Sequence, residues 1–188
     1  MQARLATTIG QRLYLRIFSS GVCDKYSYCN AMKHLYDEIQ NPVPAIMHIP
    51  DERVENYEEE EWNKICEHCG KEIVNGIKQI HQKRLYDTPS GDLEPGCLYW
   101  NTWYPKNFFW DNHDGPHLMA VLPNNNHWNI DSRASNCTMP DDKIHRCWVR
   151  HGEVPNITVD KNGNTCQAGG GSIEVRDYHG FLQNGNFT

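Results

Sequence analysis

Between Cys137 and Cys166 the chain carries three cysteines and two histidines within thirty residues. His145 and Cys147 are two residues apart, so on a β-strand their side chains would face the same side and could bind one ion. Cys166 would return to them across a hairpin, and Cys137 would join from the preceding loop. Thiolates and imidazoles grouped in this way are typical of zinc sites. We therefore predict a Zn²⁺ site formed by these four residues, the alternative being buried, inert cysteines.

A second candidate metal site lies in the motif CEHCG at residues 66–70. Cys66 and Cys69 can bind one ion from a tight turn, which is the form of a zinc knuckle, and Gly70 would relax the backbone beside them. A structural zinc needs two further ligands. The sequence leaves open whether these come from Cys23 and Cys29, from His81 or from Cys97. A redox dithiol and plain thiols are the alternatives to metal binding.

The segment His151-Gly152-Glu153 matches half of the zinc deaminase signature. The other half, a downstream Pro-Cys-X-X-Cys, is absent, which excludes a deaminase. Glu153 could still act as a general base on a metal-bound water, with His151 and the later His179 as further catalytic candidates. The alternative is structural, with Glu153 in a surface turn and His179 as an ordinary polar residue.

Composition and charge restrict the classes of function. The formal net charge is −6 and the basic residues are scattered, which argues against non-specific nucleic-acid binding but leaves a local basic groove open. The first 23 residues contain Arg12 and Arg16 and lack the apolar run of a signal peptide, and no stretch approaches the roughly 20 apolar residues of a membrane span. We therefore expect a cytoplasmic protein, or a virion component, whose eight cysteines are thiols or metal ligands.

The elements that must position these residues fall into two regions. In residues 1–96 we expect a strand over Leu13–Phe18, a helix over 31–40 and a helix over 72–86, because apolar residues recur there at helical spacing. From Cys97 onward, short apolar runs alternate with turn residues, which is typical of antiparallel strands. These strands are expected at 98–104, 118–122, 127–130, 157–159 and 165–168, with hairpin turns at Lys161–Asn164 and Asn184-Gly185.

The predicted fold class is therefore α+β. A partly helical N-terminal region with a zinc knuckle would occupy residues 1–96, and a small Cys/His-rich antiparallel β domain would occupy residues 97–188.

Several sequence runs resemble a known family. They are HRCWVRHGE at 145–153, PNITVDKNG at 155–163, Thr165-Cys166, Gly169 to Ile173 and HGFL at 179–182. Together they resemble a Cys/His-rich family of bacteriophages and bacteria that has no established activity and whose members are sometimes labelled ammonia monooxygenases. They are also distantly similar to domains proposed as zinc peptidases in bacterial ubiquitin-like systems. The resemblance covers roughly residues 97–188 and, more loosely, the Cys66/Cys69 knuckle.

Two functions follow as hypotheses. The first is a phage or bacterial metal-dependent hydrolase, with a peptidase role suggested by the resemblance. The second is a non-catalytic protein in which zinc stabilises the fold, serving as an interaction module or virion component with a protein or peptide partner, including other phage proteins. Closed four-ligand sites are structural, whereas catalytic sites keep one position open. The number of ligands at each ion therefore separates the two hypotheses.

Overall fold

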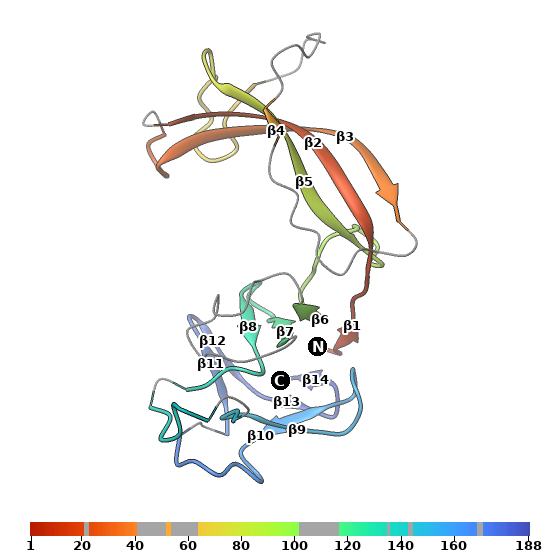
Figure 1. Cartoon of the computed structure of the whole chain (residues 1–188), viewed down its shortest axis with the longest axis vertical. Coiled ribbons are helices and arrows are strands. Elements are labelled where there is room, and N and C mark those ends of the chain that lie inside the picture. The colour runs from red at the N-terminus through yellow and green to blue at the C-terminus, as the bar shows by residue number, and fades with distance from the viewer. Residues whose placement is uncertain are drawn as a thin grey trace. The chain divides into compact units, whose positions relative to one another are not determined.

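The computed structural model describes residues 1–20, 23–40, 52–53, 64–101, 117–134, 136–142, 145–168 and 171–188. Every regular element in these ranges is a β-strand, and none is a helix (Figure 1). The predicted α+β class is therefore wrong, and the described protein is mainly β. The described residues likewise contain no helix with the length and hydrophobicity needed to cross a membrane.

The chain divides into two compact units. Unit 2 is continuous and comprises Thr8–Leu85, whereas unit 1 combines Met1–Thr7 with Tyr86–Thr188. Unit 2 is thus inserted after the first strand of unit 1.

The sheet of unit 2 contains four strands in the order β3-β2-β5-β4. Their bounds are Thr8–Ser20 for β2, Tyr28–Ile39 for β3, Glu52–Arg53 for β4 and Ile77–Tyr86 for β5. β2 and β3 form a long antiparallel hairpin that runs from the pair Gly10 and Ile39 to the pair Ser20 and Tyr28. The strand predicted at Leu13–Phe18 is confirmed as the centre of β2.

Both predicted helices are strands in the structure. Residues 31–40 largely coincide with β3, and residues 77–86 of the second predicted helix form β5. A β-bulge lies between Leu13 and Tyr14, so the spacing of residues that share one face changes along β3. The apolar residues at helical spacing in fact lie on both faces of the sheet, because Met32 is paired with Arg16 and Tyr36 with Leu13. Pairing along the whole length of β2 then overrides the local pattern.

Unit 1 contains two four-stranded sheets and a hairpin. The first sheet has the order β1-β6-β7-β8, the second β14-β13-β10-β9, and β11 pairs with β12. The bounds are β1 Arg4–Leu5, β6 Cys97–Asn101, β7 His117–Val121, β8 His127–Asn129, β9 Val149–His151, β10 Thr158–Asp160, β11 Ile173–Val175, β12 Tyr178–Gly180, β13 Leu182–Gln183 and β14 Asn186–Phe187.

The strands predicted at 98–104, 118–122, 127–130 and 157–159 correspond to β6, β7, β8 and β10, although residues 102–104 lie outside the described residues. The turn at Asn184-Gly185 is also confirmed, with positive φ at both residues. The predicted strand at 165–168 is wrong, because this segment is a loop and β10 pairs with β9 and β13 instead.

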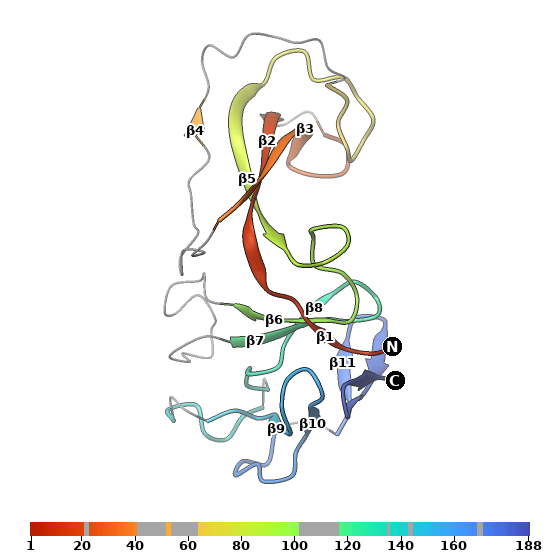
Figure 2. The ribbon, with the colours of Figure 1, turned by 90° about the vertical axis from the view of Figure 1, so that its right-hand side faces the viewer.

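The core of unit 1 joins its two sheets. Leu98 and Leu118 of the first sheet pack with Val159 and Leu182 of the second, and all four are buried. The N-terminal strand β1 lies parallel to β6, as Figure 2 also shows, and Gln2 forms an antiparallel bridge with Asn186 of β14. Residues from both ends of the chain therefore complete the same unit.

Candidate metal centres

The first centre, here named the four-thiol cluster, lies in unit 2 and consists of Cys23, Cys29, Cys66 and Cys69. Cys66 and Cys69 lie on a tight turn whose arms are bridged between Ile65 and Glu72. The Gly70 amide donates to the Cys66 carbonyl over 2.9 Å, and Gly70 has a φ of +75°. A left-handed conformation at this position favours glycine, so the turn expected for the knuckle is present with Gly70 in the expected place.

The second pair of thiols comes from the β2–β3 connection. Cys29 is a buried residue near the start of β3 and is paired with Ser19 of β2, while Cys23 lies in the loop before it. The Glu67 amide donates to the Asn30 carbonyl over 2.9 Å, which holds the knuckle against β3. Of the alternatives that the sequence left open, the structure therefore brings Cys23 and Cys29 to the knuckle.

The four-thiol cluster has the dimensions of a tetrahedral metal site. All four sulfur atoms lie within 4.8 Å of one another, and Sγ of Cys29 is 3.6 Å from Sγ of Cys69. Zn–S bonds of about 2.3 Å in a tetrahedron place the sulfurs about 3.8 Å apart, whereas a disulfide bond needs about 2.05 Å. All eight cysteines are free thiols. The donor set and its spacing therefore fit a metal such as zinc.

Local electrostatics already favour a thiolate at Cys66. Burial opposes its ionisation, but backbone hydrogen bonds from Asn30, Cys69 and His68 to its sulfur outweigh burial and lower its pKa to about 6. The Asn30 amide lies 3.4 Å from that sulfur. Burial instead raises the pKa of the Cys29 thiol to about 12, and the neighbouring cysteines add to this effect. A bound cation would stabilise both as thiolates.

The second centre, here named the histidine–thiol cluster, lies in unit 1 and consists of Cys137, His145, Cys147 and Cys166, the set predicted from the sequence. Sγ of Cys147 lies 3.7 Å from Sγ of Cys166 and 3.7 Å from Nε2 of His145. The same tetrahedral geometry predicts about 3.8 Å between two sulfurs and about 3.6 Å between sulfur and nitrogen. This cluster also fits a metal such as zinc.

The predicted route to the histidine–thiol cluster is only partly correct. His145 and Cys147 lie in the loop before β9, not on a strand, and Cys166 lies in the loop after the turn at Lys161–Asn164 rather than on a hairpin arm. The Asn164 side-chain amide donates to the carbonyls of Cys147 over 3.1 Å and Ala168 over 2.8 Å. Its carbonyl accepts the Cys166 amide over 3.1 Å. The hydrogen bonds of the Asn164 side chain, rather than pairing between two strands, therefore hold the loop with Cys166 beside Cys147.

Arg133 supports the loop that carries the histidine ligand. This residue is 6% exposed, and its guanidinium donates to the backbone carbonyls of Pro140, Asp142 and His145. A planar guanidinium can satisfy several carbonyls at once, which an ammonium group cannot do in the same geometry. Arg133 thereby fixes the loop between Cys137 and His145.

A buried carboxylate ties the cluster loop to the core of unit 1. Asp131 is fully buried and accepts the Leu118 amide over 2.7 Å at Oδ2. Its Oδ1 lies 3.1 Å from Nε of Arg150 and 3.6 Å from Nε of Arg146, close enough for charge pairing although neither contact is a hydrogen bond. Arg146 stands between the ligands His145 and Cys147. This ion pair therefore anchors the ligand loop beside β7.

The thiols of the histidine–thiol cluster differ from one another as those of the four-thiol cluster do. Burial raises the pKa of the Cys147 thiol to about 12. Burial also opposes ionisation of Cys166, but a backbone hydrogen bond with Ala168 and side-chain hydrogen bonds with His145 and Cys147 lower its pKa to about 6. Each cluster thus combines one readily ionised thiol with one that a bound metal would have to deprotonate.

The three predicted catalytic residues lie outside both clusters. Glu153 is exposed in a turn, and its backbone carbonyl accepts the Asn156 amide over 2.7 Å. His151 on β9 is exposed, with Nε2 2.9 Å from Oδ1 of Asp160. His179 on β12 is also exposed, with Nε2 2.9 Å from Oγ of Ser172. The structure therefore does not bring them together with the metal ligands.

Sequence reasoning found every residue of the histidine–thiol cluster but did not anticipate its supports, Arg133 and Asn164. Their hydrogen bonds depend on the geometry of the loops, which no local pattern of the sequence indicates. For Cys23 and Cys29, the available signal was a pair of cysteines flanking a break between two strands. Comparison with protein-family models, with curated proteins and with solved structures finds no match to this chain. The resemblance described above therefore stays a prediction.

Proposed function

We propose that the protein is a non-catalytic, zinc-stabilised interaction module in which each unit is held together by one structural Zn²⁺ ion. The observation that carries this proposal is the number of ligands. Each cluster offers four donor atoms within 4.8 Å of one another, which fills a tetrahedral coordination sphere. A catalytic zinc normally keeps one position for water or substrate, so two filled spheres favour structural roles.

Burial of the donor atoms supports the same conclusion. Cys29 and Cys66 in unit 2, and His145, Cys147 and Cys166 in unit 1, are all buried. The other three donors, Cys23, Cys69 and Cys137, are half-buried, so a substrate would have to displace one of the four donors of a cluster before it reached the ion. Hydrolysis of a peptide by a metal-bound water needs a general base. Among the described residues, neither cluster contains a carboxylate that could be this base, and the exposed Glu153 belongs to neither cluster.

The free energy of zinc binding is as large as the free energy of unfolding of a typical domain, so bound zinc would decide whether each unit folds. Structural zinc in small peptides binds with apparent free energies of about 10–16 kcal/mol, and a whole domain is typically stable by about 5–15 kcal/mol. Loss of one ion would therefore remove most or all of the stability of its unit.

Elemental analysis of protein purified without chelators tests the proposal. We expect about two zinc equivalents per chain, about one in Cys29→Ser and Cys147→Ser, and about none in the double variant. Cys97→Ala is the matched control, because Cys97 is equally buried but belongs to neither cluster. Less than one equivalent in the wild-type protein would refute the proposal.

The hydrolase hypothesis makes the opposite prediction for Glu153. In our proposal Glu153→Gln keeps both zinc ions and all binding functions. Hydrolysis of a peptide library by the wild-type protein, abolished in Glu153→Gln at unchanged zinc content, would replace the structural function with a catalytic one.

A further inference from the structure

One face of the unit 2 sheet carries alternating aromatic and basic side chains. Along β2, Leu13, Leu15 and Ile17 are buried on one side. The alternate residues Arg12, Tyr14, Arg16 and Phe18 are only half-buried on the other side, which we call the open face. Four residues of β2 in this order span about 20 Å, since a strand rises about 3.3 Å per residue.

The neighbouring strands extend the open face. The register places His34 beside Tyr14, Asn30 beside Phe18 and the exposed Tyr28 beside Ser20. From β5, Nζ of Lys83 lies 5.1 Å from the centre of the Tyr14 ring, and the His81 ring lies 6.4 Å from it. Three strands therefore contribute to one aromatic and basic surface.

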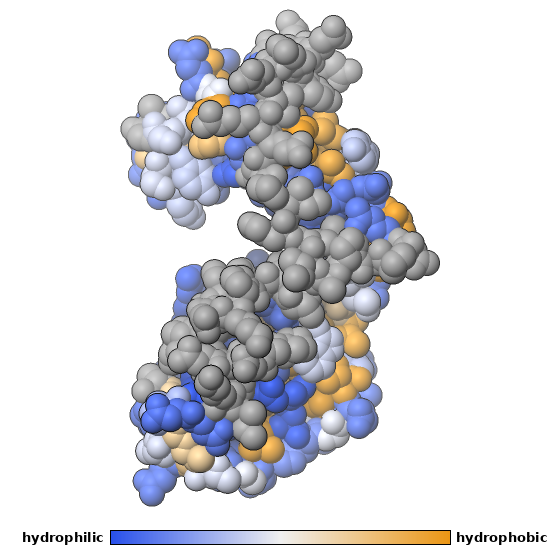
Figure 3. Space-filling model, viewed as in Figure 1, coloured by the Kyte–Doolittle hydropathy of each residue, from blue (hydrophilic) through white to orange (hydrophobic). Residues whose placement is uncertain are grey.

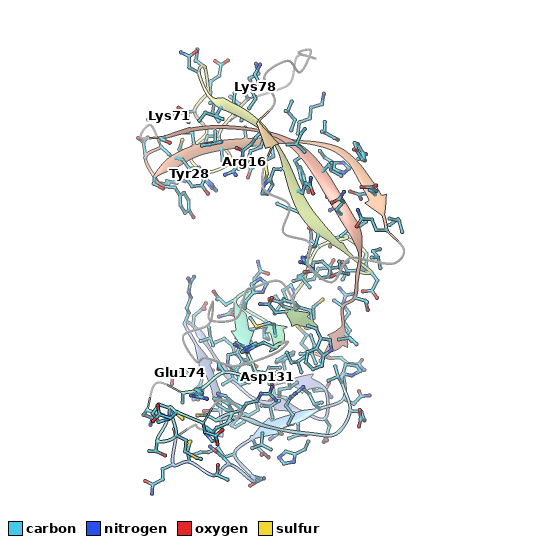
Figure 4. The ribbon with its side chains drawn as sticks, viewed as in Figure 1. Arg16, Tyr28, Lys71, Lys78, Asp131 and Glu174 are labelled. Atoms are coloured by element: carbon cyan, nitrogen blue, oxygen red, sulfur yellow. The ribbon has the colours of Figure 1, made fainter. Side chains whose placement is uncertain are left out.

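Arg16 organises the end of the open face next to the four-thiol cluster. Its guanidinium carbon lies 5.2 Å from the centre of the Phe18 ring and 5.5 Å from that of Tyr28, and its Nε donates to the side chain of Asn30. Figure 4 shows Arg16 and Tyr28 together at this end of the sheet. Cys29, a metal ligand, directly follows Tyr28, so the cluster fixes the position of the ring.

The charge of the open face differs from that of the whole chain. Its described residues include the basic Arg12, Arg16 and Lys83, and Arg12 pairs with the carboxylate of Asp37 at 2.8 Å. In Figure 3 hydrophilic and hydrophobic residues also interleave over unit 2. A partner that fits such a surface has flat apolar rings joined by anionic groups.

We propose that the open face binds single-stranded nucleic acid. Bases would stack on Tyr14, Phe18 and Tyr28, and the phosphates between them would pair with Arg16 and Lys83, as in sheets that bind single strands without strict sequence preference. A duplex hides its base faces in its own stack and cannot use these rings. The proposal rests on the zinc-stabilised fold proposed above, because the four-thiol cluster holds the strand that carries Tyr28.

Fluorescence anisotropy of a labelled 15-nucleotide DNA of mixed sequence, with the same sequence as a duplex for comparison, tests the proposal. We expect the zinc-loaded protein to bind the single strand at least about 10-fold more tightly than the duplex. With two phosphate contacts, from Arg16 and Lys83, the slope of log affinity against log salt should be about −1.4. Tyr28→Ala should weaken binding about 10-fold, the effect expected from the loss of one base stack. Arg16→Gln should both weaken binding and bring the slope to about −0.7.

Lys161→Gln in unit 1 is the control, since it removes an exposed cation far along the sequence from β2, β3 and β5. We expect it to bind as the wild-type protein does. Equal affinity for the duplex, or unchanged affinity in Tyr28→Ala and Arg16→Gln, would overturn the proposal. Absence of binding by protein that holds two zinc ions would overturn it as well and leave a protein partner for this face. Zinc content is measured on the same samples, so failure of the fold is distinguished from failure of the binding site.

Discussion

Nδ1 of His145 lies 3.3 Å from the hydroxyl oxygen of Thr165, while Nε2 of the same ring lies 3.7 Å from the sulfur of Cys147. The two ring nitrogens of His145 thus have different neighbours. Nε2 faces the thiols and is the atom that would bind the metal, so Nδ1 carries the proton and donates it to the hydroxyl group. The Thr165 hydroxyl in turn donates to Sδ of Met139. Thr165 therefore selects both the tautomer and the orientation of the histidine ligand.

Thr165→Val removes this contact at nearly constant volume. Loss of a hydrogen-bond partner behind a metal ligand typically costs about 10–100-fold in affinity, so we expect zinc binding at the histidine–thiol cluster to weaken at least about 10-fold. Competition with a chromogenic chelator measures this affinity. Thr158→Val is the control, because its hydroxyl accepts the Asn184 amide over 2.9 Å and touches neither cluster. Equal zinc affinity in Thr165→Val and wild type would show that the hydroxyl does not position the ring.

Arg133→Met removes the guanidinium that holds three carbonyls of the ligand loop. Each hydrogen bond from a charged donor contributes about 1.5–3 kcal/mol, and the abandoned carbonyls are partly resolvated, so we expect a loss of about 3 kcal/mol in the free energy of unfolding. Denaturant unfolding of the zinc-loaded protein gives this value. Arg4→Met, at a partly exposed ion pair with Glu94, should change stability by less than about 1 kcal/mol. A loss at Arg133 no greater than at Arg4 would contradict the assigned role.

Proton competition should set the pH dependence of zinc binding. The raised pKa of about 12 for Cys29 and Cys147 means that both are protonated near neutrality without metal, so each cluster must release at least one proton when zinc binds. Apparent affinity should therefore fall about 10-fold per pH unit or more between about pH 8 and 6.5. Cys66 and Cys166 have a pKa of about 6, so they are ionised in that range and add to the loss only below it.

Chelator competition with zinc-loaded protein at a series of pH values, corrected for protonation of the chelator, measures this dependence. The sign follows from the direction of each shift: a raised pKa favours the protonated, metal-free thiol, so acid opposes metal binding. An affinity that stays constant from about pH 8 to 6.5 would contradict the prediction.

The ligands were predictable because their chemistry is local. Cys137, His145, Cys147 and Cys166 stand out by residue type, and so does the Cys66/Cys69 knuckle with its Gly70. The cysteines that join the Cys66/Cys69 knuckle were harder to predict from the sequence. Cys29 approaches Cys69 because the knuckle is held against β3 by the hydrogen bond from the Glu67 amide to the Asn30 carbonyl, and this approach of residues 40 positions apart is a property of the tertiary structure.

The sequence predicts helices where the structure has β3 and β5 for the same reason. The spacing of Met32, Leu35, Tyr36 and Ile39 fits a helix when it is considered alone. The structure pairs Arg12 with Asp37 and stacks Tyr14 against His34, contacts that stabilise a strand and lie across the hairpin. Such cross-strand pairs have no signal within a local window, whereas turns such as Asn184-Gly185 depend on two adjacent residues and were correctly placed.

The insertion of unit 2 into unit 1 also has a consequence for synthesis on the ribosome. Thr8–Leu85 is one continuous segment and contains all four thiols of its cluster. Strand β1, by contrast, is made before unit 2 but must remain without its partner β6 until about 90 further residues have been added, which takes on the order of 5–20 s. Of the two units, the inserted one is therefore the first whose chain is complete, and the unit that contains β1 closes after it.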